Sequence, residues 1–348
     1  MNLKGRQKIG MKKVNVRNAV GMRLCHDVTE IRDGFKGPAF RRNHVIGNDD
    51  IEHLLNIGKR HVYVWDESIS EIHEEECALR MAAALPVEGA HYEGPSEGKM
   101  VLKADTEGLF TVDRDLLASL NNVPDFTVST IPDHYAVKPG DRLASMRIIP
   151  LVTAEKNIVE VEELCRNRRL FEIHPYLPLR TAVIITGSEV YSGRICDRFE
   201  PVIRAKLKKF PGEIIGTAVC DDSADMIRET AGKFIGSGAD LLILTGGMSV
   251  DPDDVTPSAV RSLGAEIISH GLPSQPGNMT LMAYLDKTAV VGVPGAAISR
   301  PVTTLDVLLP QIFTGVRFTR RELFNLAEGG LCQMCRQCHF PNCTYGRY

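Results

Sequence analysis

The arrangement of apolar and polar positions changes near residue 170 and divides the chain into two regions. In the first region, short segments alternate apolar with polar residues between Gly, Pro or Asp, which is typical of half-buried strands. We predict strands within His61–Asp66, Gly98–Ala104 and Tyr135–Leu151. Two helices are predicted as well, over Asn48–Leu55 with Asn48 as the N-cap and over Glu74–Leu85. This region is therefore expected to be a β-rich α+β fold.

In the second region the apolar segments become continuous, which is typical of strands buried on both faces. These segments are AVIIT (Ala182–Thr186), EIIGTAV (Glu213–Val219), LLILT (Leu241–Thr245) and AVVGV (Ala289–Val293). Helical patterns follow them: one carries Phe199, Ile203 and Leu207, and others begin at Ser223, at Thr256 as an N-cap before Pro257, and at Arg300–Pro301, the last running to Phe313. Strands that alternate with helices predict a three-layer α/β/α domain with a mostly parallel sheet.

The expected domains are a β-rich accessory region over 1–175, the α/β domain over 176–320 and a Cys-rich, metal-binding tail over 321–348. The first boundary lies in RRLFEIHPYLPLR (Arg168–Arg180), which we interpret as a linker because it contains Pro175 and Pro178.

The composition narrows the class of protein. Of 348 residues, 43% are hydrophobic and 24% are charged, which is typical of a globular protein. A net charge of −3 suggests no polyanion-binding surface, so no nucleic-acid partner is expected. No segment reaches the roughly 20 apolar residues of a membrane span, and the basic N-terminus lacks the apolar segment of a signal peptide. We therefore expect a cytoplasmic protein without a membrane partner.

Ligands of open α/β sheets bind at the carboxyl ends of the strands, so the loops that follow the predicted strands are the candidates for chemistry. After the first strand, TGSEV places Gly187 in a tight turn and Glu189 at the sheet edge. After the second strand, Asp221 and Asp222 precede Ser223. A solvated turn or an ordinary helix cap would also contain such acids, so these two loops alone leave a structural role open.

The third loop, LTGGMSVDPDDVTP, combines glycines with acids. Gly246 and Gly247 let the backbone approach a ligand, and Ser249 offers a hydroxyl group. The acids are Asp251, Asp253 and Asp254. A phosphate cradle would use backbone N–H groups with Lys or Arg, whereas acids beside a Gly-rich loop favour an anionic ligand held through Mg²⁺.

Two later loops complete the candidate site. PSQPGNM contains Pro276 and Gly277 in a stiff segment. VGVPGAAIS ends a strand with Pro294 and Gly295 and places Ser299 at the expected N-cap of the last predicted helix, where an anion could bind. Each of these loops alone would be an ordinary turn.

The segment LCQMCRQCHFPNCTYGRY contains cysteines in a C-x₂-C-x₂-C-x₄-C arrangement, at Cys332, Cys335, Cys338 and Cys343. Such gaps let thiolates converge on one metal centre, and four thiolates suit either structural zinc or an iron–sulfur cluster. Unbound thiols on a disordered tail are the alternative. The isolated cysteines are expected to be small buried hydrophobic residues: Cys25, Cys77, Cys165, Cys196 and Cys220.

These motifs together make Thr181–Phe313 resemble the molybdopterin-binding domain shared by molybdopterin adenylyltransferases and molybdopterin molybdenumtransferases. TGSEV is similar to a TGDE-type loop, and Asp221–Asp222 to an acidic second strand end. TGGMSVDPDDVTP is similar to both the SGGVSVG and the TGGTG…DVTP loops, and also to a loop of the competence/damage-inducible proteins. VGVPGAAIS is similar to GLPGNPVS, and PSQPGNM lies where KPGKP-type residues are found.

The resemblance implies that Glu189, Asp222 and Asp254 are the acids around Mg²⁺ and molybdate. It also implies a set of residues that bind the pterin and its phosphates: Gly187, Gly246, Gly247, Ser249, Asp251, Pro276, Gly277, Pro294, Gly295 and Ser299.

The function implied is molybdenum cofactor biosynthesis by a transferase that binds adenylylated molybdopterin, inserts molybdate with Mg²⁺ and releases AMP. The alternative is a non-catalytic molybdopterin-binding sensor or delivery protein for a molybdoenzyme, and an adenylyltransferase is a third hypothesis. The insertase signature of the DNSAMDGYA type has only a weak counterpart in Ile131–Asp141, which favours the alternative, whereas the retained acids favour the enzyme. Relatives form dimers or trimers, so a homo-oligomer is expected by analogy.

Overall fold

The structure is a computed structural model that describes residues 10–32, 34–66, 71–249, 251 and 254–347. The chain forms two compact units. Unit 1 contains residues 1–104, 113–131 and 140–171, and unit 2 contains 105–112, 132–139 and 172–348. Two short segments of the N-terminal half therefore belong to the same unit as the C-terminal half. The three-part division expected from the sequence stays a prediction.

Unit 1 begins with a small module around its own apolar core, which includes Leu24, Leu54 and Val64. Its elements are β1 (Gly10–Asn15), η1 (Val16–Asn18), β2 (Val28–Arg32), β3 (Phe35–Phe40), α1 (Asp50–Asn56) and β4 (His61–Asp66). β1 pairs with β4 and β2 with β3, both antiparallel. The helix predicted from Asn48 is present, but its N-cap is Asp49.

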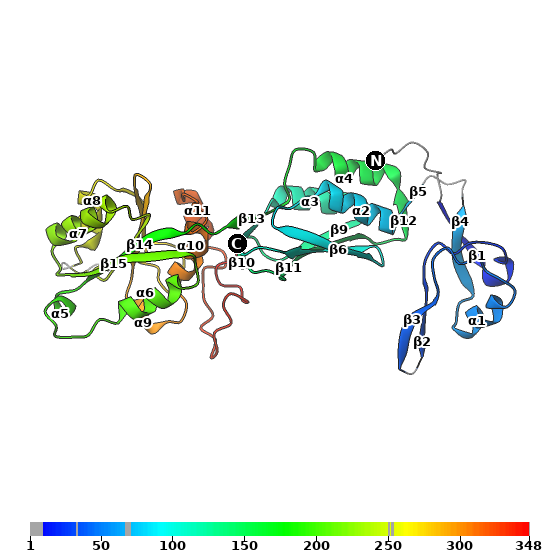
Figure 1. The fold of residues 1–348 in the computed structure, drawn as a ribbon, viewed down its shortest axis with the longest axis horizontal. Helices are drawn as coiled ribbons and strands as arrows, with labels where there is room; N and C mark the ends of the chain where they lie inside the picture. Colours follow the sequence, from blue (N-terminus) through cyan, green and yellow to red (C-terminus); the bar gives the residue numbers. More distant parts are fainter. Residues whose placement is uncertain (1–9, 33, 67–70, 250, 252–253, 348) are drawn as a thin grey trace. The chain divides into compact units, whose positions relative to one another are not determined.

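The rest of unit 1 is a four-stranded sheet in the order β6-β7-β11-β9, with α2, α3 and α4 packed on one side of it (Figure 1). The strands alternate buried and more exposed side chains, as the sequence pattern predicts for a sheet with one covered face. Its elements are β5 (Glu71–His73), α2 (Glu74–Ala84), β6 (Ala90–Ser96), β7 (Lys99–Ala104), α3 (Arg114–Asn122), β9 (Phe126–Thr130), β11 (Arg142–Ile148), β12 (Val152–Ala154) and α4 (Glu155–Leu164).

A three-stranded sheet in the order β10-β8-β13 joins distant parts of the sequence. Its strands are β8 (Gly108–Val112), β10 (Tyr135–Val137) and β13 (Phe171–Pro175). β13 lies inside the segment that we predicted to be a linker, so this part of the segment is a strand, although the boundary between the two units falls within the same segment. Phe171 and Ile173 are buried in alternation, which is why the segment forms a strand despite its prolines.

The main sheet of unit 2 has six strands in the order β15-β14-β16-β19-β18-β17. The first four are parallel to one another. β18 runs antiparallel to both of its neighbours, β19 and β17, so β17 has the same direction as the first four and the mostly parallel sheet is present. The strands are β14 (Leu179–Thr186), β15 (Gly212–Cys220), β16 (Leu241–Thr245), β17 (Glu266–His270), β18 (Leu281–Leu285) and β19 (Thr288–Val293).

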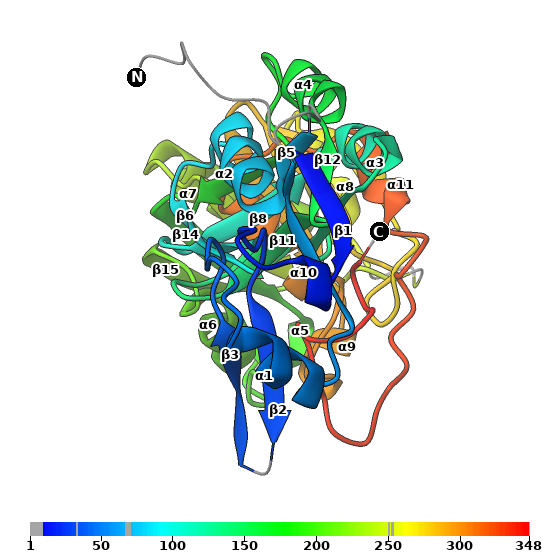
Figure 2. The same cartoon turned by 90° about the vertical axis from the view of Figure 1, so that its right-hand side faces the viewer.

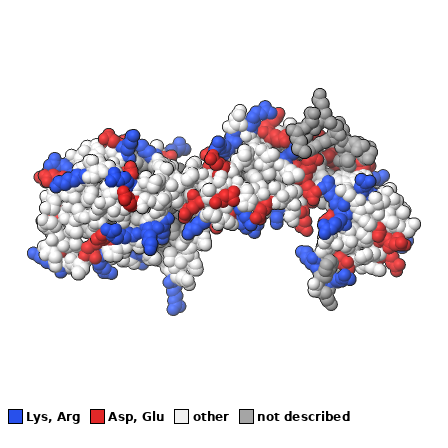
Figure 3. All heavy atoms as spheres, in the orientation of Figure 1, with Lys and Arg blue, Asp and Glu red and all other residues white. Residues whose placement is uncertain are grey.

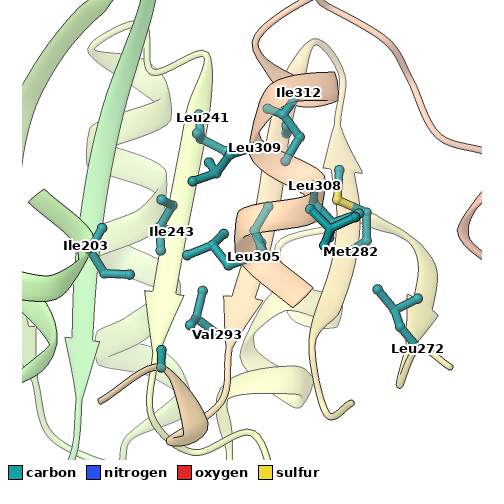
Figure 4. Close-up of a cluster of buried hydrophobic side chains, with 14 of the residues drawn as sticks. Ile203, Leu241, Ile243, Leu272, Met282, Val293, Leu305, Leu308, Leu309 and Ile312 are labelled. Atoms are coloured by element: carbon teal, nitrogen blue, oxygen red, sulfur yellow. The ribbon is translucent and has the colours of Figure 1, made fainter. Parts of the chain in front are cut away.

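Helices cover both faces of this sheet (Figure 1). α7 and α8 pack against one face with Ala182 and Ile184, and α6, α9, α10 and α11 pack against the other with Val183 and Ile185. Figure 4 shows Leu305 and Leu309 on this second face. Successive residues of β14 thus enter two different cores, which explains its continuous apolar sequence. The helices are α5 (Ser188–Tyr191), α6 (Phe199–Leu207), α7 (Ala224–Gly236), α8 (Thr256–Ser262), α9 (Ala296–Ser299), α10 (Thr304–Ile312) and α11 (Arg320–Asn325).

Three predicted helix starts can be compared with the structure. Ser223 caps α7 as predicted, because its side chain accepts a hydrogen bond from Met226 N. Thr256 is the first residue of α8 and not its N-cap. The helix predicted from Arg300 begins only at Thr304, after a capping box of Thr303 and Asp306. Arg300 is extended because a residue before proline disfavours the helical conformation.

The isolated cysteines are mostly buried. Cys25, Cys77, Cys165 and Cys220 lie in the interior, whereas Cys196 is exposed and contradicts the prediction, because it lies in the connection between α5 and α6. Burial raises the pKa of Cys25 and of Cys77 to about 12. In the described part of the chain, no helix is long and apolar enough to cross a membrane. Basic and acidic side chains are interspersed on the face shown in Figure 3.

Candidate functional site

The register of the main sheet brings the predicted loops to one edge. At the carboxyl ends of the parallel strands, Thr186 lies opposite Cys220, and Thr245 lies opposite both Ile185 and Val293. The loops that follow β14, β15, β16 and β19 therefore leave the sheet on the same side (Figure 1). The loop between β17 and β18 reaches that side too, because antiparallel β18 begins opposite the end of β19. All five loops selected from the sequence thus share one edge.

Buried threonines hold the Gly-rich loop. The Thr186 hydroxyl donates to the Thr245 carbonyl at 3.0 Å, and the Thr256 hydroxyl donates to the Gly246 carbonyl at 3.1 Å. The two hydroxyl oxygens are 3.2 Å apart. Sequence reasoning missed Thr186 and Thr256 as site residues, although a threonine that ends an apolar strand is a signal for such a contact. The loop is therefore fixed at both its start and its end.

Gly246 and Gly247 both have backbone conformations that favour glycine, with φ of +87° and +57°. A Cβ atom at Gly246 would lie 2.4 Å from the Thr186 carbonyl oxygen, and one at Gly247 would lie 2.7 Å from the Thr256 hydroxyl. Both glycines are therefore required by the close approach of the loop to the threonines. This is a local, structural reason for the GG pair that does not depend on a ligand.

We expect Gly246→Ala to lower the free energy of unfolding by about 1–3 kcal/mol, because the new side chain adds a backbone clash to a left-handed conformation. Gly295→Ala is the matched control in the same candidate site, since Gly295 has a helical φ of −54° and nothing lies within 4 Å of its Cβ position. Urea-induced unfolding of both variants provides the measurement. Equal stabilities for the two variants would contradict the proposed fit of the loop.

The segment TGSEV is a short helix rather than an open turn. Gly187 has a φ of 147°, and its N–H donates to the Cys220 carbonyl at 3.2 Å before α5 begins. The Asp222 carboxylate accepts a hydrogen bond from Ser188 N at 2.8 Å, which joins the first two loops. Glu189 is exposed on α5. The Asp222 carboxylate therefore binds the first residue of α5, the short helix that also carries Glu189.

Two acids of the third loop, Asp251 and Asp254, are hydrogen-bonded to each other. The Asp254 carboxylate accepts from Asp251 N at 2.9 Å, and Asp254 N donates to the Asp251 carbonyl at 3.0 Å. Ser249 is exposed, and Asp253 lies outside the described residues. Within the described ranges, no three His, Cys, Asp or Glu residues are close enough to hold one metal ion. Glu189, Asp222 and Asp254 thus lie on one edge of the sheet without forming a three-acid cluster.

The last two loops are attached to α9 and α10. The Pro276 carbonyl accepts from Thr304 N at 3.0 Å, and buried Gly277 with φ +105° fits closely against Thr304. Pro294 is half-buried, and Gly295 is exposed. Ser299 is the last residue of α9 and not the N-cap of the following helix, so its predicted place is corrected.

One further residue of this edge was not predicted. His270 lies at the end of β17, and its Nε2 atom is 3.2 Å from the Met248 carbonyl of the Gly-rich loop. The strand pair β17–β18 was missed in the sequence, and the position of His270 could not be found without it.

A comparison with known proteins identifies the family of this unit. Residues 182–314 match the family model described as "Probable molybdopterin binding domain". The chain contains a molybdopterin-binding domain. The resemblance predicted for Thr181–Phe313 is confirmed by this match. Residues 13–66 match a second model, described as "Domain of unknown function (DUF8806)".

Curated relatives match part of the chain. The chain is 32% identical over 121 residues to a molybdopterin molybdenumtransferase of Staphylococcus epidermidis, covering 33% of this chain and 29% of the relative. It is 28% identical over 149 residues to the molybdopterin molybdenumtransferase of Synechococcus elongatus, and the match covers 40% of this chain and 37% of the relative. A CinA-like protein of Mycobacterium sp. is 33% identical over 90 residues, and the match covers 26% of this chain and 21% of the relative. The match thus spans well under half the length of each of these relatives.

Solved structures are similar over part of the chain. The tungsten cofactor synthesizing protein MoaB of Pyrococcus furiosus has a TM-score of 0.34 and 20% identity, and the match covers 39% of this chain and 93% of that one. A molybdenum cofactor biosynthesis protein of Pyrococcus furiosus has a TM-score of 0.28 and 13% identity, covering 90% of this chain and 66% of that one.

Proposed function

We propose that the molybdopterin-binding domain binds adenylylated molybdopterin at the strand-end edge, and that the protein inserts molybdate and releases AMP. The observation that supports this proposal is the strand register, which places five family-like loops on a single edge. A ligand that spans a pterin, a phosphate chain and a nucleotide needs several loops at once, and one loop alone would be an ordinary turn.

The residues of this edge would act mainly by positioning the substrate. Gly246 and Gly247 have no side chain between the ligand and the backbone, and the threonine contacts hold their loop in place. Ser249 and Ser299 are exposed hydroxyl groups that can bind phosphate oxygens, and Pro276 and Pro294 give their loops a fixed shape. A loop that is ordered before binding holds the reacting groups with little reorganisation.

The acids at this edge fit Mg²⁺ by their chemistry. Mg²⁺ prefers oxygen ligands, keeps several waters and is commonly bound by one or two carboxylates together with substrate phosphates. Glu189 and Asp222 would hold it from adjoining segments, with Asp254 on the third loop. When bound, the ion would neutralise charge on the phosphate and on the incoming molybdate. Such a site does not require three protein acids around one point.

One observation favours the alternative function, a cofactor sensor or delivery protein. Asp133 is one of the two acids of Ile131–Asp141, the segment that most nearly matches the insertase signature, and it is half-buried. It accepts from Val112 N at 3.0 Å and from His134 N at 2.8 Å. Burial by itself would raise the pKa of Asp133, but these hydrogen bonds and the His134 ring lower it. Asp133 therefore has a structural role in unit 2.

The deciding experiment measures AMP release from adenylylated molybdopterin on addition of molybdate and Mg²⁺, with full-length protein purified without oxygen. We expect release that requires molybdate. Tight binding of the pterin without release would reject the insertion reaction and support the sensor or delivery protein, and failure to bind would reject both. The molybdoenzyme partner, the homo-oligomer and the cytoplasmic location stay predictions.

A further inference from the structure

The chain after α11 forms a loop that returns to its own beginning (Figure 2). Gly346 N donates to the Gly329 carbonyl at 2.9 Å and closes this loop. Between these two glycines lie all the cysteines of the C-x₂-C-x₂-C-x₄-C motif. We call residues 329–347 the cysteine loop. Because its ends meet, the motif is held within a closed segment.

The beginning of the cysteine loop is bound to the connection between β17 and β18. Gln275 N donates to the Gly330 carbonyl at 2.7 Å, and Cys332 N donates to the Gln275 carbonyl at 2.8 Å. Gln275 and Leu331 thereby form an isolated parallel bridge. The first cysteine of the motif is therefore fixed directly to a loop of the molybdopterin-binding domain.

The end of the cysteine loop is anchored by two large side chains. Tyr345 is 2% exposed, and its hydroxyl group lies 3.0 Å from Ser274 Oγ and 3.3 Å from the Pro276 carbonyl. Arg347 donates to the His134 carbonyl at 3.2 Å and to the Pro341 carbonyl at 2.8 Å, and it lies over the Tyr135 ring. These contacts contradict a disordered tail, which was the alternative for this segment.

A cavity of about 320 Å³ is lined largely by the cysteine loop. All four cysteines of the motif and His339 line it, and Pro276, Arg300 and Pro301 form its wall on the side of the domain. Cys335, Cys338 and Cys343 are exposed and Cys332 is half-buried, so the thiols are accessible. The four thiols therefore line one cavity, and both ends of the segment that carries them are anchored to the domain. This arrangement is suited to binding a metal centre.

We propose that this cavity holds a [4Fe–4S] cluster ligated by Cys332, Cys335, Cys338 and Cys343. A zinc ion would need all four sulfur atoms about 2.3 Å from one point. In the part of the chain that the structure describes, no three potential ligands are close enough to share one ion. A cluster fits better, because each thiolate binds a different iron atom and the thiolates can surround a wider space.

Two further features agree with a cluster. The run C-x₂-C-x₂-C supplies three closely spaced thiolates from one segment, as in iron–sulfur proteins. Met334 N donates a hydrogen bond to Cys332 Sγ at 3.5 Å, and N–H contacts of this kind stabilise the charge of cluster-bound thiolates. Because Pro276 is part of the cavity wall, the cluster also braces the Gln275–Gly277 turn of the candidate pterin site. Only the importance of this turn for the pterin rests on the proposed function.

The test uses full-length protein purified without oxygen and reconstituted with ferric iron, sulfide and a thiol reductant that supplies the electrons for partial reduction of the iron. We expect about four iron atoms and four acid-labile sulfides per chain, with the broad visible absorption of a cluster. Cys335→Ser and Cys338→Ser should each reduce the iron content about fivefold or more, since a cluster normally needs all four thiolates. Cys196→Ser is the control, because Cys196 is an equally exposed cysteine outside the cysteine loop and should retain the iron.

Circular dichroism of each variant shows whether the fold is kept, and iron is counted per folded chain. Removal of iron with a chelator should increase amide hydrogen exchange in residues 271–278 and leave β14 unchanged. Zinc at about one ion per chain without sulfide would overturn the proposal in favour of a structural zinc site. A folded wild-type chain that binds neither metal would also overturn it, whatever the result of the AMP assay.

Discussion

Asp222→Asn is expected to reduce molybdate-dependent AMP release about 100-fold or more while the fold stays intact. The Asp222 carboxylate accepts a hydrogen bond from Ser188 N at 2.8 Å, and an asparagine oxygen can accept the same bond. The substitution therefore keeps the contact between the first two loops and removes only the negative charge. Glu189→Gln removes the neighbouring charge on α5 in the same way, so its effect should be similar.

The measurement is AMP release at saturating Mg²⁺ and across a Mg²⁺ titration, with circular dichroism of every variant. Glu213→Gln is the matched control, because Glu213 is an exposed acid at the opposite, amino-terminal end of β15. It should retain wild-type turnover. Wild-type turnover in Glu189→Gln and Asp254→Asn as well would refute the assignment of these acids to the site, although the fold would be unaffected.

Lys206→Met is expected to lower the free energy of unfolding by about 3–5 kcal/mol. The Lys206 ammonium lies 2.6 Å and 2.7 Å from the two Asp306 oxygens, and the side chains are only 7% and 5% exposed. Asp306 also accepts from Thr303 N at 2.8 Å in the capping box of α10. Without Lys206, the Asp306 carboxylate would remain buried without its cation, and such an unpaired buried charge strongly destabilises the folded protein.

Urea unfolding of the full chain measures this loss. In the double variant Lys206→Met with Asp306→Asn, no buried charge remains and the asparagine can still cap α10, so most of the stability should return. Arg204→Met is the control on the same helix, because Arg204 pairs with Glu200 at the surface and such a pair contributes under about 1 kcal/mol. A loss in Lys206→Met no greater than in Arg204→Met would show that the buried pair is unimportant.

The sequence predicts the molybdopterin-binding domain well because its strands are buried on both faces. Ala182–Thr186 and Leu241–Thr245 have no polar interruption, and β14 and β16 contain these segments. The order of loops along an α/β sheet follows from the alternation of strands and helices, so the shared edge could also be predicted. The side-chain contacts within the site could not be predicted, because they join residues that are far apart in the sequence. Asp222 meets Ser188, and Thr186 meets Thr256, only after the strands have aligned.

Very short helices and misplaced helix starts were the other source of error in the prediction of secondary structure. α5 and α9 each have only four residues, which is too short for a helical repeat to be visible in the sequence. The start of α10 was placed at Arg300–Pro301, since a proline at the first turn is common, whereas the capping box three residues later decides it. The anchors of the cysteine loop, such as Tyr345, carry no sequence pattern, so the docking of this loop on Gln275 could not be predicted.

The division of the chain has a consequence for dissecting the protein. Residues 105–112 and 132–139 belong to unit 2, although residues of unit 1 precede and follow each of them. A protease cut at residue 171 would therefore leave β8 and β10 on the fragment that carries unit 1. No single cleavage can therefore separate the two complete units, and a fragment of residues 172–348 would lack two strands of its own fold. To obtain unit 2 complete, the segments of β8 and β10 must be supplied together with residues 172–348.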